Sequence, residues 1–577
     1  MSADTGRAPR DPAADERLES SAAKPWLSSY PPGVPATIDP GAAGTLVDIF
    51  DDTAKRYPDR PALESFGRRM TYGELAGHAA AVGSWLAEAG IGRGDRVAIM
   101  LPNVMAFPPI MFGVLMAGAT VVNVNPLYTP RELSGQLRDS GARTIFVLEN
   151  FAHTVQAVLG EVTLDRIVIV KPGDLLGFKG GVINLVSRYV KKAVPAYDLP
   201  GTISLATVVK AGRAAPRVPV RVTLDDVAFL QYTGGTTGVA KGAMLTHRNV
   251  AANVVQCELW LRTGMGDGPH IMVTALPLYH IFALTCCCMV LVRLGGCQLL
   301  IANPRDIPGF VKTLQTRPFT CISGVNTLYN ALARAPGMKE VDFSKLTLCV
   351  AGGMATQSAV AEAWKRLTGK PIVEGYGLSE TSPVLSINRL DIEAFTGTIG
   401  YPVSSTEVSV RVGDREVPSG EAGELCARGP QIMAGYWNRP DETAKVMTAD
   451  GYFRTGDVAV FEPDGALRII DRMKDMILVS GFNVYPNEVE EVVAGCPGIA
   501  EVAVIGLPDE RSGETVAAYI VRSDPALTEQ DVVAWSRERL APYKVPHRIV
   551  FREALPKTNV GKVLRRVLRE ETAAPQT

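Results

Sequence analysis

The sequence predicts an α/β fold with a large N-terminal domain of two parallel-type sheets sandwiched by helices, a β-rich subdomain and a small mobile C-terminal α+β domain. A chain of 577 residues exceeds what one hydrophobic core supports, so two or more domains are expected. From residue 45 onward, short apolar strands alternate with helical patterns, which is typical of parallel sheets covered on both faces. Near residue 404 the pattern changes to short strands separated by Gly and Asp turns.

These changes in pattern predict the domain boundaries. Residues 1–40 are rich in Ala, Pro, Ser and charge, which predicts a disordered or draped tail. Residues 41–470 are the predicted N-terminal domain, with 404–470 as its β-rich subdomain. The charged segment 471–475 is the predicted hinge, and 476–577 the C-terminal lid domain of ordinary domain size.

Within the predicted N-terminal domain, helical spacing indicates a helix over 73–90, and apolar runs predict strands over 95–101, 117–124 and 144–148. Further predictions are strands at 407–412, 423–428 and 466–470 in the β-rich part. In the lid we predict helices at 488–493 and 530–540 and strands at 500–507 and 519–521.

Composition excludes several classes of protein. The 59 basic and 60 acidic residues nearly cancel, so a nucleic-acid protein held by its overall field is not expected. Nine cysteines show no metal-ligand spacing, and the run 286–288 is predicted to lie in the core, in a reducing compartment. The first residues lack the apolar core of a secretory signal, and the most apolar segment, 281–292, is too short to span a membrane. We therefore expect a soluble, cytoplasmic protein.

The segment 232–241, YTGGTTGVAK, is the most informative part of the chain. Glycine backbone N–H groups can approach phosphate oxygens, threonine hydroxyls add donors and the lysine adds positive charge. It follows an apolar strand at 227–230 and precedes a stretch that can begin a helix with Thr246 as cap, so we expect strand, loop and helix in that order. A flexible surface turn is the alternative, which three threonines and a lysine disfavour. The predicted phosphate-binding residues are Thr233, Gly234, Gly235, Thr236, Thr237, Gly238 and Lys241.

Three further motifs carry polar side chains. Residues 374–381, EGYGLSET, follow a predicted strand at 371–373, where an aromatic ring can stack on a purine and a carboxylate can hold Mg²⁺. Asp457 ends YFRTGD and could accept bonds from ribose, while Lys562 lies in a turn-rich loop. Taken singly, Glu380 could pair at a surface, Asp457 could close a turn and Lys562 could be an ordinary solvated lysine.

Together, these motifs resemble those of the adenylate-forming enzymes: acyl-CoA synthetases, peptide-synthetase adenylation domains and firefly luciferase. Within that superfamily the sequence is most like bacterial long-chain fatty acyl-CoA synthetases. One departure is Arg454, where relatives often have His. The likeness covers about residues 45–569 and is carried by 232–247, 275–283, 322–332, 471–488 and 555–566.

The resemblance implies ATP, Mg²⁺ and coenzyme A as cofactors. It places Thr233 and Glu380 on Mg²⁺, and Asp457 and Arg472 on the ribose. Tyr376 would stack on adenine, and Lys562 would bridge the carboxylate and α-phosphate oxygens. The remaining implied nucleotide-site residues are Gly352, Gly353, Glu374, Gly375, Gly377 and Thr381.

For the second half of the reaction, the resemblance implies Lys474 as the hinge and Gly481 as the close approach to pantetheine. His280 by itself is more typical of a satisfied core histidine, but the family match makes it a residue of the acyl-adenylate site. The implied catalytic set is therefore Lys562, Glu380, Thr233 and His280.

The implied function is ATP-dependent activation of a medium- or long-chain fatty acid through an acyl-adenylate, followed by transfer to CoA with release of AMP and pyrophosphate. Two alternatives stay open: a fatty acyl-AMP ligase that stops at or hands on the adenylate, and an inactive fatty-acid binding or trafficking protein. Amino-acid adenylation is disfavoured, because no aspartate directly follows residues 277–280 to meet an ammonium group. No nucleic acid is expected as a partner, and a homodimer is common in the family.

Residues 182–192, VINLVSRYVKK, predict a basic amphipathic helix. Val182, Leu185, Val186 and Tyr189 fall on one face, with Arg188, Lys191 and Lys192 elsewhere. The favoured interpretation is a helix packed on its own domain. The alternative is peripheral contact with the anionic inner face of the membrane.

Overall fold

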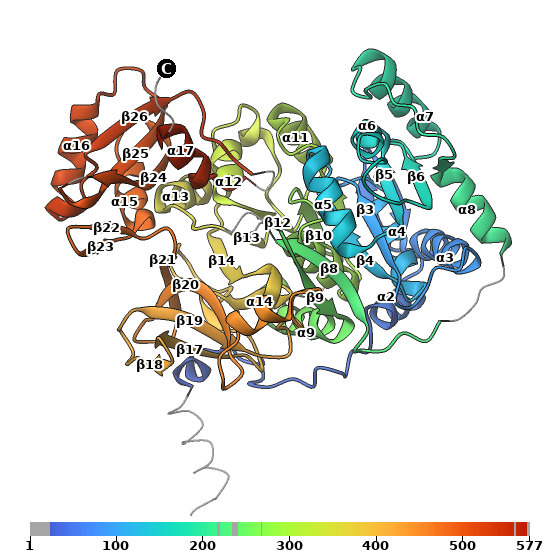
Figure 1. The fold of residues 1–577 in the computed structure, drawn as a ribbon, viewed down its shortest axis with the longest axis horizontal. Helices are drawn as coiled ribbons and strands as arrows, with labels where there is room; N and C mark the ends of the chain where they lie inside the picture. The colour runs from blue at the N-terminus through green and yellow to red at the C-terminus, as the bar shows by residue number, and fades with distance from the viewer. Residues whose placement is uncertain are drawn as a thin grey trace, which may run out of the picture.

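The computed structural model describes residues 24–215, 220–233, 240–266, 268–509, 511–558 and 561–573, and Figure 1 shows their arrangement. Two large sheets and the helices around them form the main body. A third sheet lies below this body in Figure 1, and the small C-terminal domain lies beside it. Within the described residues, every helix is too short or too polar to cross a bilayer.

The first large sheet has nine strands in the order β16-β15-β14-β13-β12-β10-β11-β1-β2. Its pairs from β14 through β1 are parallel, whereas β15, β16 and β2 add antiparallel edges. Its strands are β1 (Pro61–Ser65), β2 (Arg68–Thr71), β10 (Ile271–Thr274), β11 (Cys297–Leu300), β12 (Cys321–Gly324), β13 (Leu348–Ala351), β14 (Ile372–Gly377), β15 (Val384–Ile387) and β16 (Tyr401–Pro402).

The second large sheet has seven strands in the order β7-β6-β5-β3-β4-β8-β9, and only its β8–β9 pair is antiparallel. The predicted strands at 95–101, 117–124 and 144–148 are confirmed as β3, β4 and β5. The strands are β3 (Arg96–Met100), β4 (Thr120–Asn123), β5 (Thr144–Leu148), β6 (Arg166–Val170), β7 (Ile203–Ser204), β8 (Val227–Thr233) and β9 (Lys241–Thr246).

Alternating side chains place the two sheets on either side of a shared helical layer. Val97 and Ile99 of β3 face the largest core cluster, whereas Ala98 and Met100 face a second cluster with helix α5. Residues 283–293 form a largely buried helical segment of this layer, which places Cys287 and Cys288 in the core as predicted. The helices are α2 (Leu46–Arg56), α3 (Tyr72–Glu88), α4 (Phe107–Met116), α8 (Leu205–Ala214), α9 (His247–Met265), η4 (Ala283–Met289) and α10 (Val290–Arg293) in the shared layer, α5 (Pro130–Ser140) and α6 (Ala152–Gln156) outside the seven-stranded sheet, and α11 (Ile307–Leu314), α12 (Asn326–Ala333) and α13 (Ser358–Thr368) outside the nine-stranded sheet.

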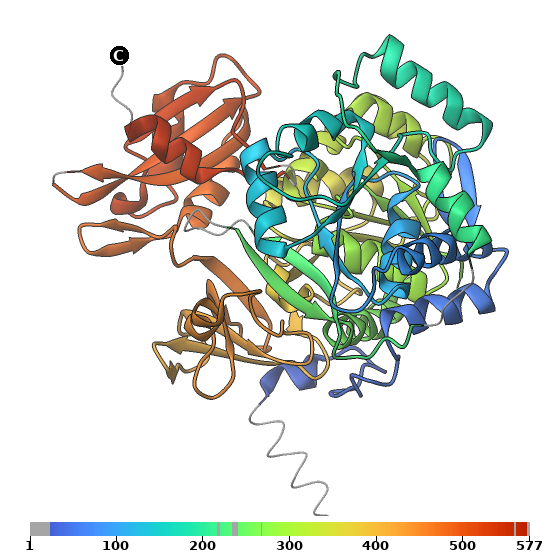
Figure 2. The same cartoon turned by 45° about the vertical axis from the view of Figure 1, so that its right-hand side comes forward.

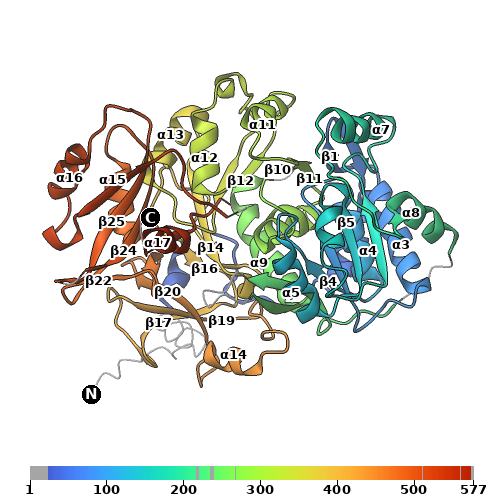
Figure 3. The same cartoon turned by 45° about the horizontal axis from the view of Figure 1, so that its top comes forward.

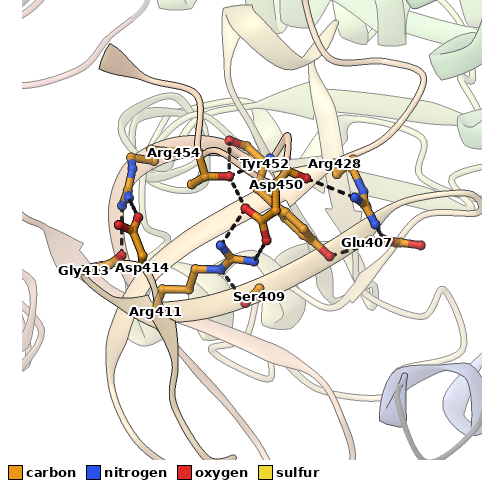
Figure 4. Close-up of polar contacts among 10 residues, drawn as sticks. Glu407, Ser409, Arg411, Gly413, Asp414, Arg428, Asp450, Tyr452 and Arg454 are labelled. Atoms are coloured by element: carbon orange, nitrogen blue, oxygen red, sulfur yellow. Dashed lines mark hydrogen bonds and ion pairs between the residues drawn. The ribbon is translucent and has the colours of Figure 1, made fainter. Parts of the chain in front are cut away.

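A five-stranded antiparallel sheet confirms the β-rich subdomain. Ion pairs link its strands and turns: Arg411 pairs with Asp450 at 2.7 Å, and Arg454 pairs with Asp414 (Figure 4). Arg454 also pairs with Glu424 at 2.9 Å. Arg454 therefore serves this surface network. The strands are β17 (Glu407–Val412), β18 (Arg415–Glu416), β19 (Gly423–Arg428), β20 (Phe453–Phe461) and β21 (Leu467–Arg472), and helix α14 is Pro440–Lys445.

The N-terminal segment that the structure describes packs on this subdomain. The short helix η1 (Pro25–Ser29) buries Trp26, whose ring stacks on Phe461 with centroids 5.8 Å apart. Farther along, the backbone N–H of Ser405 donates to the carbonyl of Ala36 at 2.8 Å. This segment therefore lies along the β-rich subdomain; the domain boundaries themselves stay predictions.

The C-terminal domain is α+β, with helices beside a mixed five-stranded sheet (Figure 3). Ser480 and Gly481 form the two-residue turn between β22 and β23, with φ of 50° and 85°. Positive φ at both positions is what a tight hairpin of this length requires. The elements are β22 (Ile477–Val479), β23 (Phe482–Val484), α15 (Pro486–Ala494), β24 (Ile499–Asp509), β25 (Gly513–Arg522), α16 (Glu529–Arg537), β26 (Arg548–Arg552) and α17 (Arg565–Ala573).

Candidate functional site

The predicted phosphate loop joins β8 to β9, not β8 to a helix. Thr233 ends β8 and pairs in register with Lys241, the first residue of β9, so the expected order of strand, loop and helix was wrong. The helix follows only after β9, where Thr246 caps α9 as predicted. The loop closes a β-hairpin because residues 241–246 form β9, an additional strand of the sheet, before Thr246 caps α9. Gly234, Gly235, Thr236, Thr237 and Gly238 lie outside the described residues.

The second motif lies at the carboxyl end of β14, where Glu374, Gly375, Tyr376 and Gly377 form the last part of the strand itself. The Tyr376 hydroxyl donates to Asp457 Oδ2 at 2.6 Å. Arg472 Nε lies 3.4 Å from Asp457 Oδ1. These contacts join a strand of the nine-stranded sheet to β20 and β21, so three of the predicted nucleotide residues lie together.

Glu374 and Thr381 are held inside this region by backbone contacts. Glu374 Oε1 accepts from the backbone N–H of Thr356 at 3.2 Å, and burial raises the pKa of its carboxyl to about 8. The fully buried Thr381 hydroxyl accepts from the backbone N–H of Leu378 at 2.9 Å. These bonds fix the turn after β14; nucleotide contacts by Glu374 and Thr381 stay predictions.

Glu380 is a buried carboxylate in η6 (Ser379–Thr381). It is positioned by residues 433–436, which lie beside β9. The Tyr436 hydroxyl donates to its Oε1 at 2.8 Å, and its carbonyl accepts from the backbone N–H of Met433 at 2.8 Å. Burial raises the pKa of Glu380, whereas the bond from Tyr436 opposes that shift. The charges of Arg472 and Lys241 oppose the shift as well, so nearby cations favour the charged form of this carboxylate.

Lys241 has an acidic partner in this structure. Its ammonium group is ion-paired with Glu442 of α14 and lies 5.2 Å from the centre of the Tyr436 ring. The same carboxylate binds Lys445, and these two lysines hold the pKa of Glu442 at about 2. A phosphate that binds Lys241 therefore has to share this ammonium group with Glu442 or replace it.

Lys562 of the small domain reaches the large domain at Gly353. A Cβ atom added to Gly353 would lie in ordinary contact with Lys562, 3.5 Å from its Cε. The φ of 80° at Gly353 is what favours glycine at this position. The backbone N–H of Lys562 donates to Thr558 Oγ1 at 3.0 Å. Burial, followed by the charge of Arg472, lowers the pKa of Lys562 to about 8, while Asp457 and Glu380 act in the opposite direction.

His280 lies close enough to Lys562 for the two to interact. Burial, with Lys562 as the second cause, lowers the pKa of His280 to about 3, so the ring is neutral. Its Nδ1 accepts from the backbone N–H of Phe282 at 3.3 Å, which leaves the proton on Nε2. The Phe282 ring in turn lies against Gly352, where an added Cβ would be 3.2 Å from a ring carbon. His280 therefore belongs to this site and not to a separate core.

A charged cluster surrounds the predicted hinge. Arg565 pairs with Glu490 at 2.8 Å, with Asp475 at 3.4 Å and with the fully buried Asp471 at 3.7 Å. Burial nonetheless raises the pKa of Asp471 to about 6. Lys474 lies exposed within this turn, and Gly481 is exposed at its hairpin tip. The hinge and pantetheine roles of these two residues stay predictions.

Two family models match the chain: the AMP-binding enzyme model over residues 50–437 and the AMP-binding enzyme C-terminal domain model over residues 488–562. The chain belongs to the AMP-binding enzyme family. The predicted resemblance and fold class are both confirmed.

Among named relatives of this AMP-binding enzyme, the long-chain-fatty-acid–CoA ligase of Salmonella typhimurium strain LT2 is 51% identical over 95% of this chain and 98% of its own. The anthranilate CoA ligase AuaEII in complex with anthranoyl-AMP has a TM-score of 0.80 at 25% identity, covering 93% of this chain and 98% of its own. ATP-bound MatB from Rhodopseudomonas palustris has a TM-score of 0.75 at 27% identity, covering 91% of this chain and 98% of its own.

The described part of the AMP-binding enzyme brings together most of the predicted site residues. Lys562, His280 and Gly353 meet at the domain boundary, close to Glu380 and Asp457. Sequence reasoning missed the residues that position these groups. They are Tyr436, Glu442, Thr356, Glu490 and Arg565. The signal was weakest for Tyr436 and Glu442, which lie 56 and 201 positions from their partners.

Proposed function

We propose that this AMP-binding enzyme activates medium- to long-chain fatty acids with ATP, forming an acyl-adenylate and pyrophosphate, and then transfers the acyl group to CoA, releasing AMP. The observation that carries the proposal is the position of Lys562. A lysine of the small domain enters a site formed by Gly353, His280, Glu380 and Asp457 of the large domain.

The first half-reaction joins two anions, so the protein has to neutralise charge and align the reactants. Lys562 supplies the mobile positive charge between the attacking carboxylate and the α-phosphate. Neutral His280 offers its Nε2–H as a donor without adding a second charge beside Lys562. Tyr376 and Arg472 fix Asp457, which is positioned to accept from the ribose hydroxyls.

The oxygen groups at Glu380 and Thr233 fit Mg²⁺. Among the described residues, no cluster of three or more His, Cys, Asp and Glu side chains could hold a metal ion by itself. A site with one or two protein oxygens that relies on substrate phosphates is typical of Mg²⁺. The buried Glu380 would bind it, Tyr436 would orient that carboxylate, and bound Mg²⁺ would offset phosphate charge.

For thioester formation, Lys562 has to leave the adenylate so that the CoA thiol can reach its carbonyl. Rotation at Lys474 would withdraw the loop of Lys562 and present the Ser480–Gly481 turn to pantetheine. Excluding water until this step protects the reactive mixed anhydride.

A ligation assay across a ladder of acids, from acetate to about C20 and including aromatic acids, tests the substrate proposal. Each buried methylene contributes about 0.8 kcal/mol, so kcat/KM should rise with chain length until the acyl site is filled. A preference for acetate or an aromatic acid over palmitate would refute it.

The Lys562→Ala variant separates the half-reactions. It should lower adenylation by about 10²–10³ or more while sparing thioester formation from pre-made acyl-adenylate. Equal losses in both halves would refute the assigned role. Adenylate without thioester in the wild type would identify an acyl-AMP ligase, and failure of ATP–pyrophosphate exchange would identify a binding protein. A homodimer stays a prediction that sedimentation can test.

A further inference from the structure

One helix of the large domain has its apolar side turned outward. Helix α7 (Phe178–Leu185) continues into the single wide turn η3 (Val186–Val190), at the end of the molecule opposite the small domain (Figures 1 and 2). The helix packs on its own domain, as the favoured interpretation expected, but its apolar stripe does not make that contact: Val182, Leu185 and Tyr189 are exposed and Val186 is half-buried. Its exposed apolar side chains are Phe178 at 92%, Val182 at 53%, Leu185 at 57%, Tyr189 at 69% and Val190 at 69%.

The opposite side of this helix attaches it to the domain. Gly180 packs directly on Gly173, where a Cβ added to either residue would lie about 2 Å from the other's carbonyl oxygen. Asn184 Oδ1 accepts from the backbone N–H of Gly173 at 2.7 Å, and Arg188 pairs with the buried Glu149 at 2.6 Å. Glycine and polar groups thus face the protein. This is the reverse of an ordinary surface helix, which buries its apolar stripe.

The hairpin between β1 and β2 extends the exposed surface. Phe66 is 55% exposed at the hairpin tip, and the Lys179 ammonium lies 3.5 Å from the position that a Cβ on the adjacent Gly67 would take. The hairpin tip therefore lies beside the start of α7. We call Phe66, Phe178, Val182, Leu185, Tyr189, Val190, Lys179, Lys191 and Lys192 together the α7 face.

The α7 face carries three lysines, Lys179, Lys191 and Lys192. Within the part of the chain that the structure describes, Lys179, Lys191 and Lys192 form no ion pair, whereas Arg188 is held by Glu149. Apolar side chains at the 4-3-4 spacing of positions 178, 182, 185 and 189, flanked by unpaired lysines, match a helix that lies in the plane of a lipid–water interface.

We propose that the α7 face docks on the surface of an anionic phospholipid bilayer, with its apolar row among the acyl chains and its lysines at the phosphate level. Charge complementarity favours this occupant, because a bilayer offers negative headgroups beside hydrocarbon. Docking leaves the small domain at the other end free to move. The inference extends the proposed function by giving the enzyme a source of its amphiphilic substrate, but it rests on binding and not on turnover.

The test is co-sedimentation of the full chain with vesicles, without substrates. Vesicles of phosphatidylcholine with phosphatidylglycerol should pellet the protein at about 50 mM salt, less so at about 500 mM, and phosphatidylcholine alone should pellet little. The triple variant Phe178→Ser/Leu185→Ser/Tyr189→Ser should weaken binding more than about tenfold, and Lys191→Glu/Lys192→Glu by about fivefold for each lysine.

Matched controls come from exposed positions elsewhere. Val412→Ser removes an apolar side chain that is 58% exposed, and Lys365→Glu/Lys370→Glu reverses two exposed lysines; both should bind as the wild type does. Unchanged thermal melting and ATP–pyrophosphate exchange with a water-soluble acid show that each variant is folded. These readouts also separate failure of this proposal from failure of the proposed function.

Three outcomes would overturn the proposal. The wild type could remain in the supernatant with anionic vesicles at low salt, or the triple variant could sediment with them as the wild type does. Sedimentation velocity could instead show a wild-type dimer that the triple variant dissociates, which would assign the α7 face to a second copy of the chain.

Discussion

Raising the pH should switch off adenylation by removing the proton from Lys562. Burial beside Arg472 lowers the pKa of Lys562 from the usual lysine value of 10.5 to about 8. The positive charge that adenylation requires is therefore lost above pH 8. The charged fraction falls from about 91% at pH 7 to about 9% at pH 9, which is a roughly tenfold loss of kcat/KM for adenylation. His280, with a pKa of about 3, does not change charge between pH 5 and 9, so it adds no further fall to the pH–rate profile in that range.

ATP–pyrophosphate exchange at subsaturating substrate measures this profile, because kcat/KM reports the free enzyme. Bound ATP and carboxylate add negative charge near Lys562 and so raise its pKa. The fall in kcat should therefore occur at higher pH than the fall in kcat/KM. The Lys562→Arg variant keeps its charge throughout, and its profile should lack the fall whatever its absolute rate. The same fall in both proteins would refute the reasoning.

Three other substitutions separate the roles of further residues. Lys474→Pro should let adenylate accumulate while CoA transfer fails, because proline restricts the backbone at the hinge; unchanged turnover would mean the pivot lies elsewhere. Tyr436→Phe removes the donor to Glu380 and should slow adenylation by about tenfold with a higher Mg²⁺ requirement, against an unchanged melting temperature. Arg565→Met leaves Asp471 buried without its cation and should destabilise the small domain by about 3–5 kcal/mol in denaturant unfolding; an unaltered transition would contradict this.

The sequence was most informative where local pattern and packing agree. Apolar runs such as 95–101 and 144–148 predicted strands because each is short, bounded by turn residues and buried in the sheet. The capping residue Thr246 was identified correctly for the same reason, since its partner Asn249 lies three residues away. The motif residues of the site were found because their side-chain types carry the chemistry.

Long-range partners could not be predicted in this way. Tyr436 bonds Glu380, 56 positions earlier in the chain, and Glu442 pairs with Lys241, 201 positions earlier. Nothing in the spacing of the chain links such pairs, because the approach of α14 to β9 is set by tertiary packing. The outward orientation of α7 was equally hidden, since the apolar stripe is the same whichever way it faces.

The ion pair between Lys241 and Glu442 has a consequence for which anions the site accepts. In the role proposed for Lys241, each incoming phosphate competes with an internal carboxylate that already binds the ammonium group. A partly exposed pair of this kind is weak, so a polyphosphate bound at several points overcomes it more readily than a singly held anion does. Glu442 thus acts as a tethered competitor. It discriminates against chloride or inorganic phosphate from the surroundings, and it recaptures the lysine as pyrophosphate departs.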